Sequence, residues 1–162
     1  MNKFLFILLI LAVCMSLTSG LLFSFSIAVS PGLKNLSDVE YIKAMKSINR
    51  EIQNAIFFLS FFSPLIVFPL SIYMCHGRFS NSTLLIAGGI FYFIGVFAVT
   101  AFINVPLNNK LESFDLLYSD AKAIHQMRTA FESPWTFWNN VRTLMSISSL
   151  VFVLLALFKY KP

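Results

Sequence analysis

Four long apolar runs divide the chain, and polar residues gather at one end of each run. The runs cover residues 4–29, 55–75, 84–105 and 141–158. A helix needs about 20 apolar residues to cross a hydrocarbon core of roughly 30 Å. The pattern therefore predicts an all-α protein, a four-helix transmembrane bundle that forms a single domain over residues 1–162.

The polar ends of the four runs are predicted to meet at one face of the membrane. Successive spanning helices alternate in direction, so the C-terminal ends of the first and third runs lie beside the N-terminal ends of the second and fourth. These ends carry the polar residues Ser30, Arg50, Asn54, Thr100, Asn104, Asn139, Arg142 and Ser146. We expect a shared polar chamber near one leaflet, and any chemistry to lie there.

The segments between the runs predict two further helices. Pro31 and Gly32 are expected to end the first helix, and Ser37 with Glu40 has the spacing of a capping box. Apolar residues then recur at helical spacing, which predicts an amphipathic helix, either in the membrane interface or as a simple lead-in to the second spanning helix. A short helix is predicted over residues 116–130, in the third connection.

Composition agrees with a membrane protein. Hydrophobic residues make up 57% of the chain and charged residues 12%, and the mean hydropathy is +0.77. The net charge is +5, but the cations are interspersed with acids and form no basic stripe. No nucleic-acid partner is therefore expected.

Cation density sets the predicted topology. The N-terminus, the turn around Arg78 and the tail with Lys159 and Lys161 carry cations and no acid, whereas the other face mixes cations with all seven acids. A raw count of cations favours the opposite orientation, while density near the helix ends favours cytoplasmic termini. We expect an integral protein of the bacterial inner membrane with both termini in the cytoplasm.

The polar cluster contains groups suited to a planar aromatic ligand. Arg50 and Arg142 supply guanidinium donors, and Trp135 and Trp138 supply stacking surfaces. Hydroxyl and amide groups accompany them at Ser30, Asn49, Asn54, Tyr92, Thr100, Asn104, Asn108 and Asn139. Two plainer interpretations stay open, in which Arg142 snorkels to the headgroups and the tryptophans form an aromatic belt.

The sequence lacks the common motifs for cofactors and metals. It has no CxxC, CxxCH, HExxH, GxGxxG or Walker pattern. Cys14 and Cys75 have apolar neighbours and are expected to pack rather than to form a disulfide. No cofactor and no metal site are predicted.

Four segments of the chain carry a family resemblance in sequence, order and spacing. The segments are FSFSIAVSPGL (23–33), AMKSINR (44–50), NVPLN (104–108) and WTFWNNVRT (135–143). They resemble the small integral-membrane anthrone oxygenase-like proteins, many of which are known only as a domain of unknown function. The resemblance implies a four-helix membrane bundle and, for the members in polyketide pathways, oxidation of an anthrone to an anthraquinone by dioxygen without a known flavin or metal.

Oxidation without a metal or flavin places demands on the site. Triplet dioxygen reacts slowly with closed-shell molecules, so the substrate must become an electron-rich enolate or phenolate, and the protein must supply oxyanion donors, a base and a dry cavity. The predicted catalytic residues are Arg50, Arg142, Asn104, Asn108, Asn139 and His125. The base stays open among His125, Glu132, Asp115 and Asp120, because no spacing selects one. Predicted substrate-binding residues are Ser30, Asn49, Asn54, Tyr92, Thr100, Trp135 and Trp138.

Three functions from different classes remain at this point. The first is an oxygenase-like enzyme that oxidises or binds a planar phenolic or quinone-type molecule. The second is a non-catalytic ligand-binding or assembly protein, in which the polar cluster ties the helices together. The third, a small transporter, is disfavoured because the runs lack an intramembrane acid. Expected partners are the lipid bilayer, a hydrophobic aromatic ligand and dioxygen, and a homo-oligomer stays open.

Overall fold

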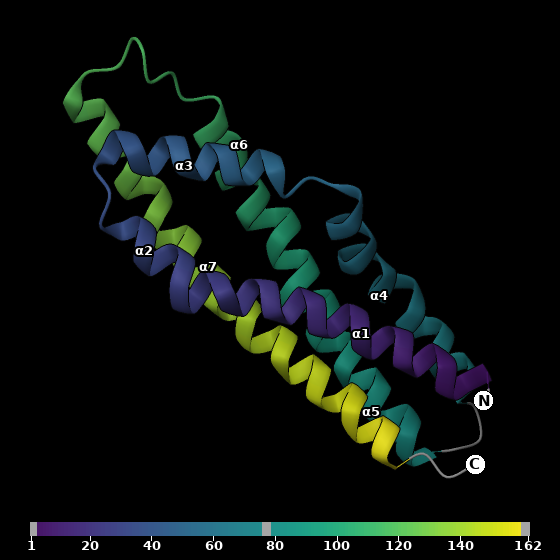
Figure 1. Cartoon of the computed structure of the whole chain (residues 1–162). Helices are drawn as coiled ribbons and strands as arrows, with labels where there is room; N and C mark the ends of the chain where they lie inside the picture. The colour runs from purple at the N-terminus through teal and green to yellow at the C-terminus, as the bar shows by residue number, and fades with distance from the viewer. Residues whose placement is uncertain (1–2, 76–78, 160–162) are drawn as a thin grey trace.

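The computed structural model describes residues 3–75 and 79–159, with side chains omitted at 79–81. The first rod joins α1 (Lys3–Ser24), the π-helical η1 (Phe25–Val29) and α2 (Ser30–Lys34). The amphipathic α3 (Asp38–Glu51) and then α4 (Ala55–Met74) follow. The third rod joins α5 (Phe79–Ile90), the π-helical η2 (Phe91–Ala98) and η3 (Thr100–Asn104), and α6 (Val105–Glu112). The long α7 (Ala121–Phe158) closes the chain (Figure 1).

Four helices in the described part of the chain are long and apolar enough to cross a membrane. The α1 helix packs against α4 and α7, and α5 packs against the same two helices, so the four rods form an antiparallel bundle. α1 begins and α7 ends at one end of this bundle, and α3 lies across the other end (Figure 1). The predicted all-α four-helix bundle is confirmed. Arg78 and Lys161, which entered the topology prediction, lie outside the described residues.

The first rod continues past the point where we predicted its end. Pro31 and Gly32 lie inside α2, and the helix ends only after Lys34. A proline inside a helix removes one backbone donor. The π-helical turn of η1 comes directly before α2, so the regular hydrogen-bond ladder is already interrupted where Pro31 enters. The expectation that Pro31 and Gly32 stop the helix is wrong.

The predicted short helix of residues 116–130 and the predicted fourth span are one helix. α7 runs for 38 residues from Ala121 to Phe158 without a break, with Pro134 inside it. Its N-terminus is set by Asp120, whose carboxylate accepts a hydrogen bond of 2.7 Å from the backbone N–H of Ala123. Residues 116–120 therefore belong to the connection before the helix.

Three of the four spanning rods are longer than a bilayer requires. At 1.5 Å per residue, α7 is about 57 Å long, whereas the hydrocarbon core measures roughly 30 Å. α1 begins and α7 ends at the end opposite α3. The helix length that exceeds the bilayer thickness therefore projects at the end that α3 covers (Figure 1). About 20 residues from that opposite end, the first rod reaches η1 and α7 reaches Asn139. The level of Asn139 is therefore near one membrane face.

The α3 helix is amphipathic, as predicted, and its capping box is present. The Ser37 side chain accepts from the backbone N–H of Glu40, and the Glu40 carboxylate accepts from the Ser37 backbone N–H at 3.0 Å. Tyr41, Ile42 and Met45 are buried in a small core that α3 shares with α6 and α7. α3 therefore packs across the projecting ends of the other helices and covers them; we call it the α3 roof.

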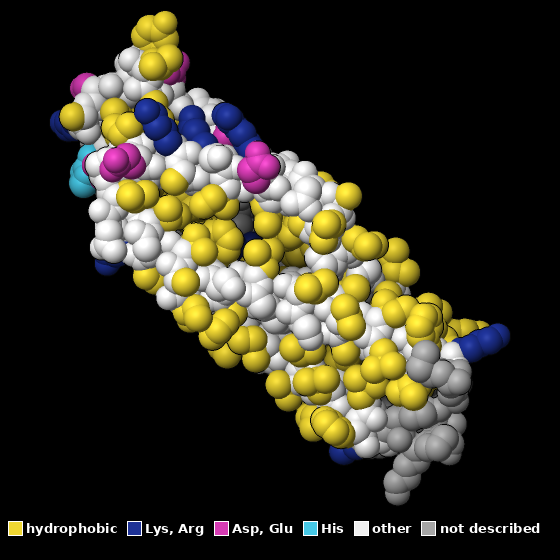
Figure 2. All heavy atoms as spheres, in the orientation of Figure 1, with side chains coloured by type: hydrophobic (Ala, Val, Ile, Leu, Met, Phe, Trp, Pro, Cys, Tyr) yellow, Lys and Arg dark blue, Asp and Glu magenta, His cyan; other side chains and the backbone are white. Residues whose placement is uncertain are grey.

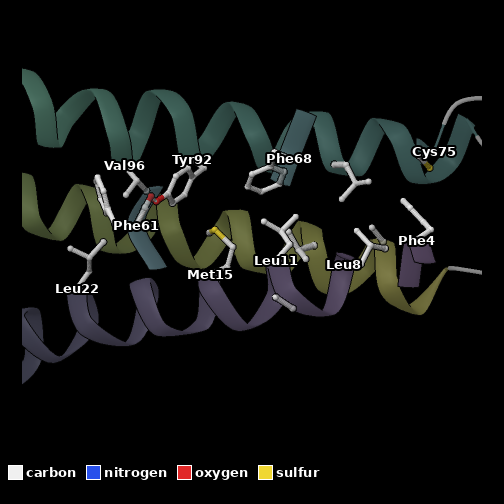
Figure 3. Packing of buried hydrophobic residues seen from close by; sticks show 14 residues of the cluster. Phe4, Leu8, Leu11, Met15, Leu22, Phe61, Phe68, Cys75, Tyr92 and Val96 are labelled. Atoms are coloured by element: carbon white, nitrogen blue, oxygen red, sulfur yellow. Dashed lines mark hydrogen bonds between the residues drawn. The ribbon is translucent and has the colours of Figure 1, made fainter. Parts of the chain in front are cut away.

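A second, larger core fills the membrane-spanning part of the bundle. Leu8, Leu11 and Met15 of α1 meet Phe68 of α4 and Tyr92 of η2 with almost no exposed surface (Figure 3). Small residues on the third rod bring α7 close. The Ser149 hydroxyl donates to the Gly88 carbonyl at 2.7 Å, which is direct contact of a side chain with a neighbouring backbone.

The tightest contact of this core predicts a large effect of a small substitution. A Cβ at Gly95 would lie 2.5 Å from Cβ of Met145. Gly95→Ala must therefore push η2 and α7 apart and should reduce the free energy of unfolding by about 1–3 kcal/mol. Thermal unfolding in detergent micelles measures the loss.

The matched control for this substitution is Gly20→Ala, because a Cβ at Gly20 meets nothing within 4 Å. Replacing Met145 with alanine in the Gly95→Ala background should recover part of the loss. Equal unfolding temperatures for Gly95→Ala and Gly20→Ala would show that the helices do not pack this closely.

Candidate functional site

A cavity of about 230 Å³ lies below α3, near the polar end of the bundle. Its lining comes from α1 and η1, α3, α4, η3 and α6, and α7. The face between α3 and α1 is hollowed at this level, and hydrophobic side chains surround the hollow (Figure 2). The cavity is close in size to the smaller sites that hold compact organic ligands, roughly 300 Å³.

Among the described residues that line the cavity, Arg142 is the only charged one. Its side chain is 7% exposed, and Nη1 donates to the Thr100 hydroxyl at 3.1 Å while Nη2 donates to Oδ1 of Asn139 at 3.0 Å. Its Cζ atom lies 5.7 Å from the centre of the Trp135 ring. Among the residues that the structure describes, no Asp or Glu lines the cavity, so the guanidinium faces it without a carboxylate partner.

Asn139 connects this arginine to the first rod. Its amide Nδ2 donates to the Ser26 hydroxyl at 3.0 Å and to the Leu22 carbonyl at 3.2 Å. The Ser26 hydroxyl also lies 2.9 Å from the Thr143 hydroxyl. Ser26 belongs to η1, where the π-helical turn changes the direction of the side chains. The network fixes the Arg142 side chain from two helices and leaves part of it available to the cavity.

Several buried polar atoms around the cavity have no hydrogen-bond partner within the described protein. They are Nδ2 of Asn49, both Nδ2 and Oδ1 of Asn104, and Nε of Arg142. Asn104 is 1% exposed and Asn49 8% exposed, so bulk water does not solvate them freely. Buried polar groups are nearly always paired, and an unpaired group is costly. These atoms are therefore available to a ligand or to ordered water that has both acceptor and donor groups.

Aromatic rings form the walls of the cavity. Trp135 is held by a hydrogen bond of 2.8 Å from its Nε1 to Oδ1 of Asn108, and it contacts the rings of Phe25 and Phe131. The α4 helix adds four phenylalanines, Phe57, Phe58, Phe61 and Phe62. A flat ligand can stack on such walls while its oxygen atoms reach the polar atoms at depth.

Seven of the predicted residues share this cavity. They are Asn49, Thr100, Asn104, Asn108, Trp135, Asn139 and Arg142. They come from α3, from the η3–α6 part of the third rod and from α7. Their roles in catalysis and binding stay predictions, but their convergence is a property of the fold.

The predicted catalytic residue Arg50 and four of the predicted substrate-binding residues lie outside this cavity. The Arg50 side chain is exposed and pairs with Glu112 outside the cavity, so the expectation that Arg50 shares the chamber is wrong. Asn54 caps α4 by accepting from the Phe57 backbone N–H at 3.0 Å. The Tyr92 hydroxyl donates to the Phe61 carbonyl in the core. Ser30 lines a shallow surface groove between α2 and α7, and Trp138 contacts Phe137.

The four candidate bases all lie outside the cavity lining. His125 pairs with Asp38 at 2.9 Å, and Glu132 accepts from Nε of Arg128 at 2.7 Å. Asp115 accepts from the Leu117 backbone N–H, and Asp120 caps α7. No spacing selected one of these residues, and the structure assigns each a structural contact instead.

The aromatic wall on α4 has no signal in the sequence. Its phenylalanines stand within an unbroken apolar run, where lipid-facing and cavity-facing residues have the same chemistry. The polar residue Gln53, which also lines the cavity, lies in the link between α3 and α4 and follows no helical spacing.

Ion pairs hold both ends of α3 over the cavity. At its N-terminal end Asp38 accepts from Nη1 of Arg128 at 2.9 Å and pairs with His125. At its C-terminal end Nε of Arg50 donates to Glu112 at 2.9 Å, and Nζ of Lys46 donates to the Glu112 carbonyl at 3.1 Å. The hydrogen bond from His125, and then the one from Arg128, hold the pKa of Asp38 below its ordinary value against the opposing effect of burial.

Comparison with known proteins identifies a family. The family model described as anthrone oxygenase matches residues 57–152, which is more than half of the chain. The matched region includes Asn104, Asn108, Trp135, Asn139 and Arg142, and leaves out Asn49 and the part of the cavity formed by the first rod. No curated protein and no solved structure matches.

The lowered pKa of Asp38 predicts how the α3 roof responds to acid. A carboxylate with a lowered pKa stabilises the folded state at pH values above its ordinary pKa near 4, and this contribution disappears as the pH falls through the lowered value. Asp38→Asn should therefore unfold at a lower temperature than the wild type at pH 5–7, and the difference should shrink below about pH 4. Thermal unfolding in detergent at stepped pH measures it.

Glu51→Gln is the control, because Glu51 is an exposed acid on the same helix whose side chain makes no hydrogen bond or ion pair that the structure describes. A constant difference between Asp38→Asn and the wild type down to pH 3 would mean that the ionised carboxylate does not anchor α3.

Proposed function

Because the chain belongs to the anthrone oxygenase family, we propose that its cavity binds a planar phenol or anthrone and promotes its oxidation by dioxygen. The observation that carries the proposal is Arg142, a buried cation that faces an aromatic-walled cavity without a carboxylate partner among the described lining residues. The unpaired amide of Asn104 supports it, because that amide offers both a donor and an acceptor to a ligand.

The buried charge favours an anionic ligand. A cation without an acidic partner at this depth is costly, and an oxyanion in the cavity would relieve the cost by accepting from the Arg142 guanidinium, whose Nε has no partner. The same interaction stabilises the ionised form of a bound phenol or anthrone and so lowers the pKa of that ligand. The carbonyl oxygen of an anthrone carries the negative charge once its methylene carbon loses a proton.

The proposed reaction follows from this ionisation. The methylene C–H of the anthrone gives its proton to water, and the resulting enolate transfers one electron to dioxygen. The superoxide and the carbon radical combine to form a peroxide anion, which takes back a proton from water to become a hydroperoxide. The hydroperoxide loses one water molecule and leaves the second carbonyl of the anthraquinone. One dioxygen is consumed and one water is released for each anthrone. Arg142 acts by stabilising the enolate, so the proposal needs no carboxylate or imidazole base in the cavity.

The surroundings of the site suit this chemistry. Aromatic side chains line much of the cavity and lower the polarity around the ligand, which strengthens the interaction of the guanidinium with an oxyanion. Asn108 orients Trp135, and Trp135 in turn lies beside the Arg142 guanidinium. The proposal uses no metal and no flavin.

We further propose that the protein lies in a bacterial inner membrane with both termini in the cytoplasm. The α3 end of the bundle would then face outward. The basic residues Lys3 and Lys159, at the opposite end, support this orientation.

Replacing the central arginine should abolish most of the activity. Arg142→Gln keeps an amide donor but removes the positive charge, so it should slow oxygen uptake on a panel of anthrones by about 100-fold or more. Oxygen uptake by the protein in lipid nanodiscs measures the loss. Arg50→Gln is the matched control and should retain the wild-type rate, because Arg50 pairs with Glu112 outside the cavity. Equal losses in both variants, or none in Arg142→Gln, would contradict the proposal.

A substitution at Asn104 separates ligand binding from an assembly role. If its amide serves a ligand, Asn104→Leu removes an unpaired buried polar group, so the ligand-free protein should unfold at an equal or higher temperature. Affinity for a hydroxyanthraquinone should fall by about tenfold. A marked loss of thermal stability with unchanged affinity would instead favour a protein in which Asn104 ties the helices together.

A further inference from the structure

The α3 helix covers much of the aqueous side of the cavity, next to the hollow between α3 and α1 (Figure 2). This helix buries Ile42 and Met45, with 0% and 1% exposure, against the projecting ends of the other helices. Ion pairs fasten it at both ends, through Asp38 and through Arg50. A ligand that entered through α3 itself would have to displace this helix against its packing and its ion pairs.

The cavity reaches the surface in part through apolar side chains, beside the exposed polar lining residues Gln53 and Asn109. Phe58, Phe62 and Val105 all line it and are 40%, 44% and 42% exposed. Phe58 and Phe62 lie in the first two turns of α4, which is a membrane span over its whole length of 20 residues. They therefore open on the apolar outer surface of a helix that is long and apolar enough to cross a membrane.

The packing of α4 explains why an opening exists there. α4 packs along α1 and α5, whereas its contacts with η3 and α6 are sparse. Below the opening, Phe62 meets Phe97 of η2 with ring centres 6.2 Å apart, so the gap is closed toward the bilayer centre. The gap is left between the start of α4 and the η3–α6 segment, at the level of Arg142 and Asn104.

We propose that the ligand enters this cavity from the hydrocarbon side of the bilayer, between α4 and the η3–α6 segment, past Phe58, Phe62 and Val105. The substrate is then a molecule dissolved in the membrane. Its identity as a phenol or anthrone rests on the proposed function, while the route itself does not. A flat apolar molecule in the bilayer can stack on the rings of Phe58 and Phe62 at the opening. Its oxygen atom contacts Arg142 only after the molecule has entered the cavity.

The test follows the fluorescence of Trp135, which lines the cavity and is 5% exposed. In a Trp138→Phe protein reconstituted in nanodiscs, Trp135 is the only tryptophan of the chain. A brominated alkane dissolved in the bilayer should quench it, whereas aqueous iodide should not. Val105→Phe narrows the opening and should reduce quenching by the alkane at least about twofold. Phe62→Ala widens it and should increase quenching.

The matched control is Ile94→Phe, since Ile94 is a lipid-facing residue of the same rod, 66% exposed, that does not line the cavity. It should leave quenching unchanged. Strong quenching by iodide, or equal quenching in Val105→Phe, Phe62→Ala and Ile94→Phe, would overturn the proposal. These outcomes need no anthrone, so a protein that fails to oxidise anthrones but shows the expected quenching contradicts the proposed function and leaves the route standing.

Discussion

The structure depends on one buried guanidinium that lacks an acidic partner among the described cavity residues. Arg142 is fixed by neutral groups, the Thr100 hydroxyl and the Asn139 amide, and by the face of Trp135. A neutral environment holds the side chain in place without cancelling its charge, so the cavity keeps a positive potential. This potential makes the cavity, with its aromatic walls and unpaired amides, suited to a flat anionic ligand.

The long helices and their π-helical turns place this arginine. Surplus length at one end of the bundle lets the rods project past the membrane face, where α3 covers them. η1 and η3 each supply a hydroxyl to the Arg142 network, Ser26 through Asn139 and Thr100 directly. A regular α-helical ladder in either rod would turn these hydroxyls in other directions. The irregular backbone is thus part of the site.

The convergence of Asn104, Asn139 and Arg142 is predictable from the sequence, because antiparallel threading puts these ends at one level. Arg50 looks equivalent in the sequence, yet it turns outward to Glu112, a residue that the helical pattern does not place beside it. The continuous α7 escapes prediction because its polar first half resembles a separate helix, and Pro31 resembles a stop only when the π-helical turn before it is unknown. The phenylalanine wall cannot be separated from lipid-facing residues by chemistry alone.

The central claim is that the charge of Arg142 stabilises a bound oxyanion. The most direct measurement is a pH titration of a hydroxyanthraquinone in nanodiscs, followed by the change of its visible spectrum on ionisation. The account predicts that the phenol bound to the wild-type protein ionises at a lower pH than the same dye in protein-free nanodiscs. A bound dye that ionises at the same or a higher pH would contradict it.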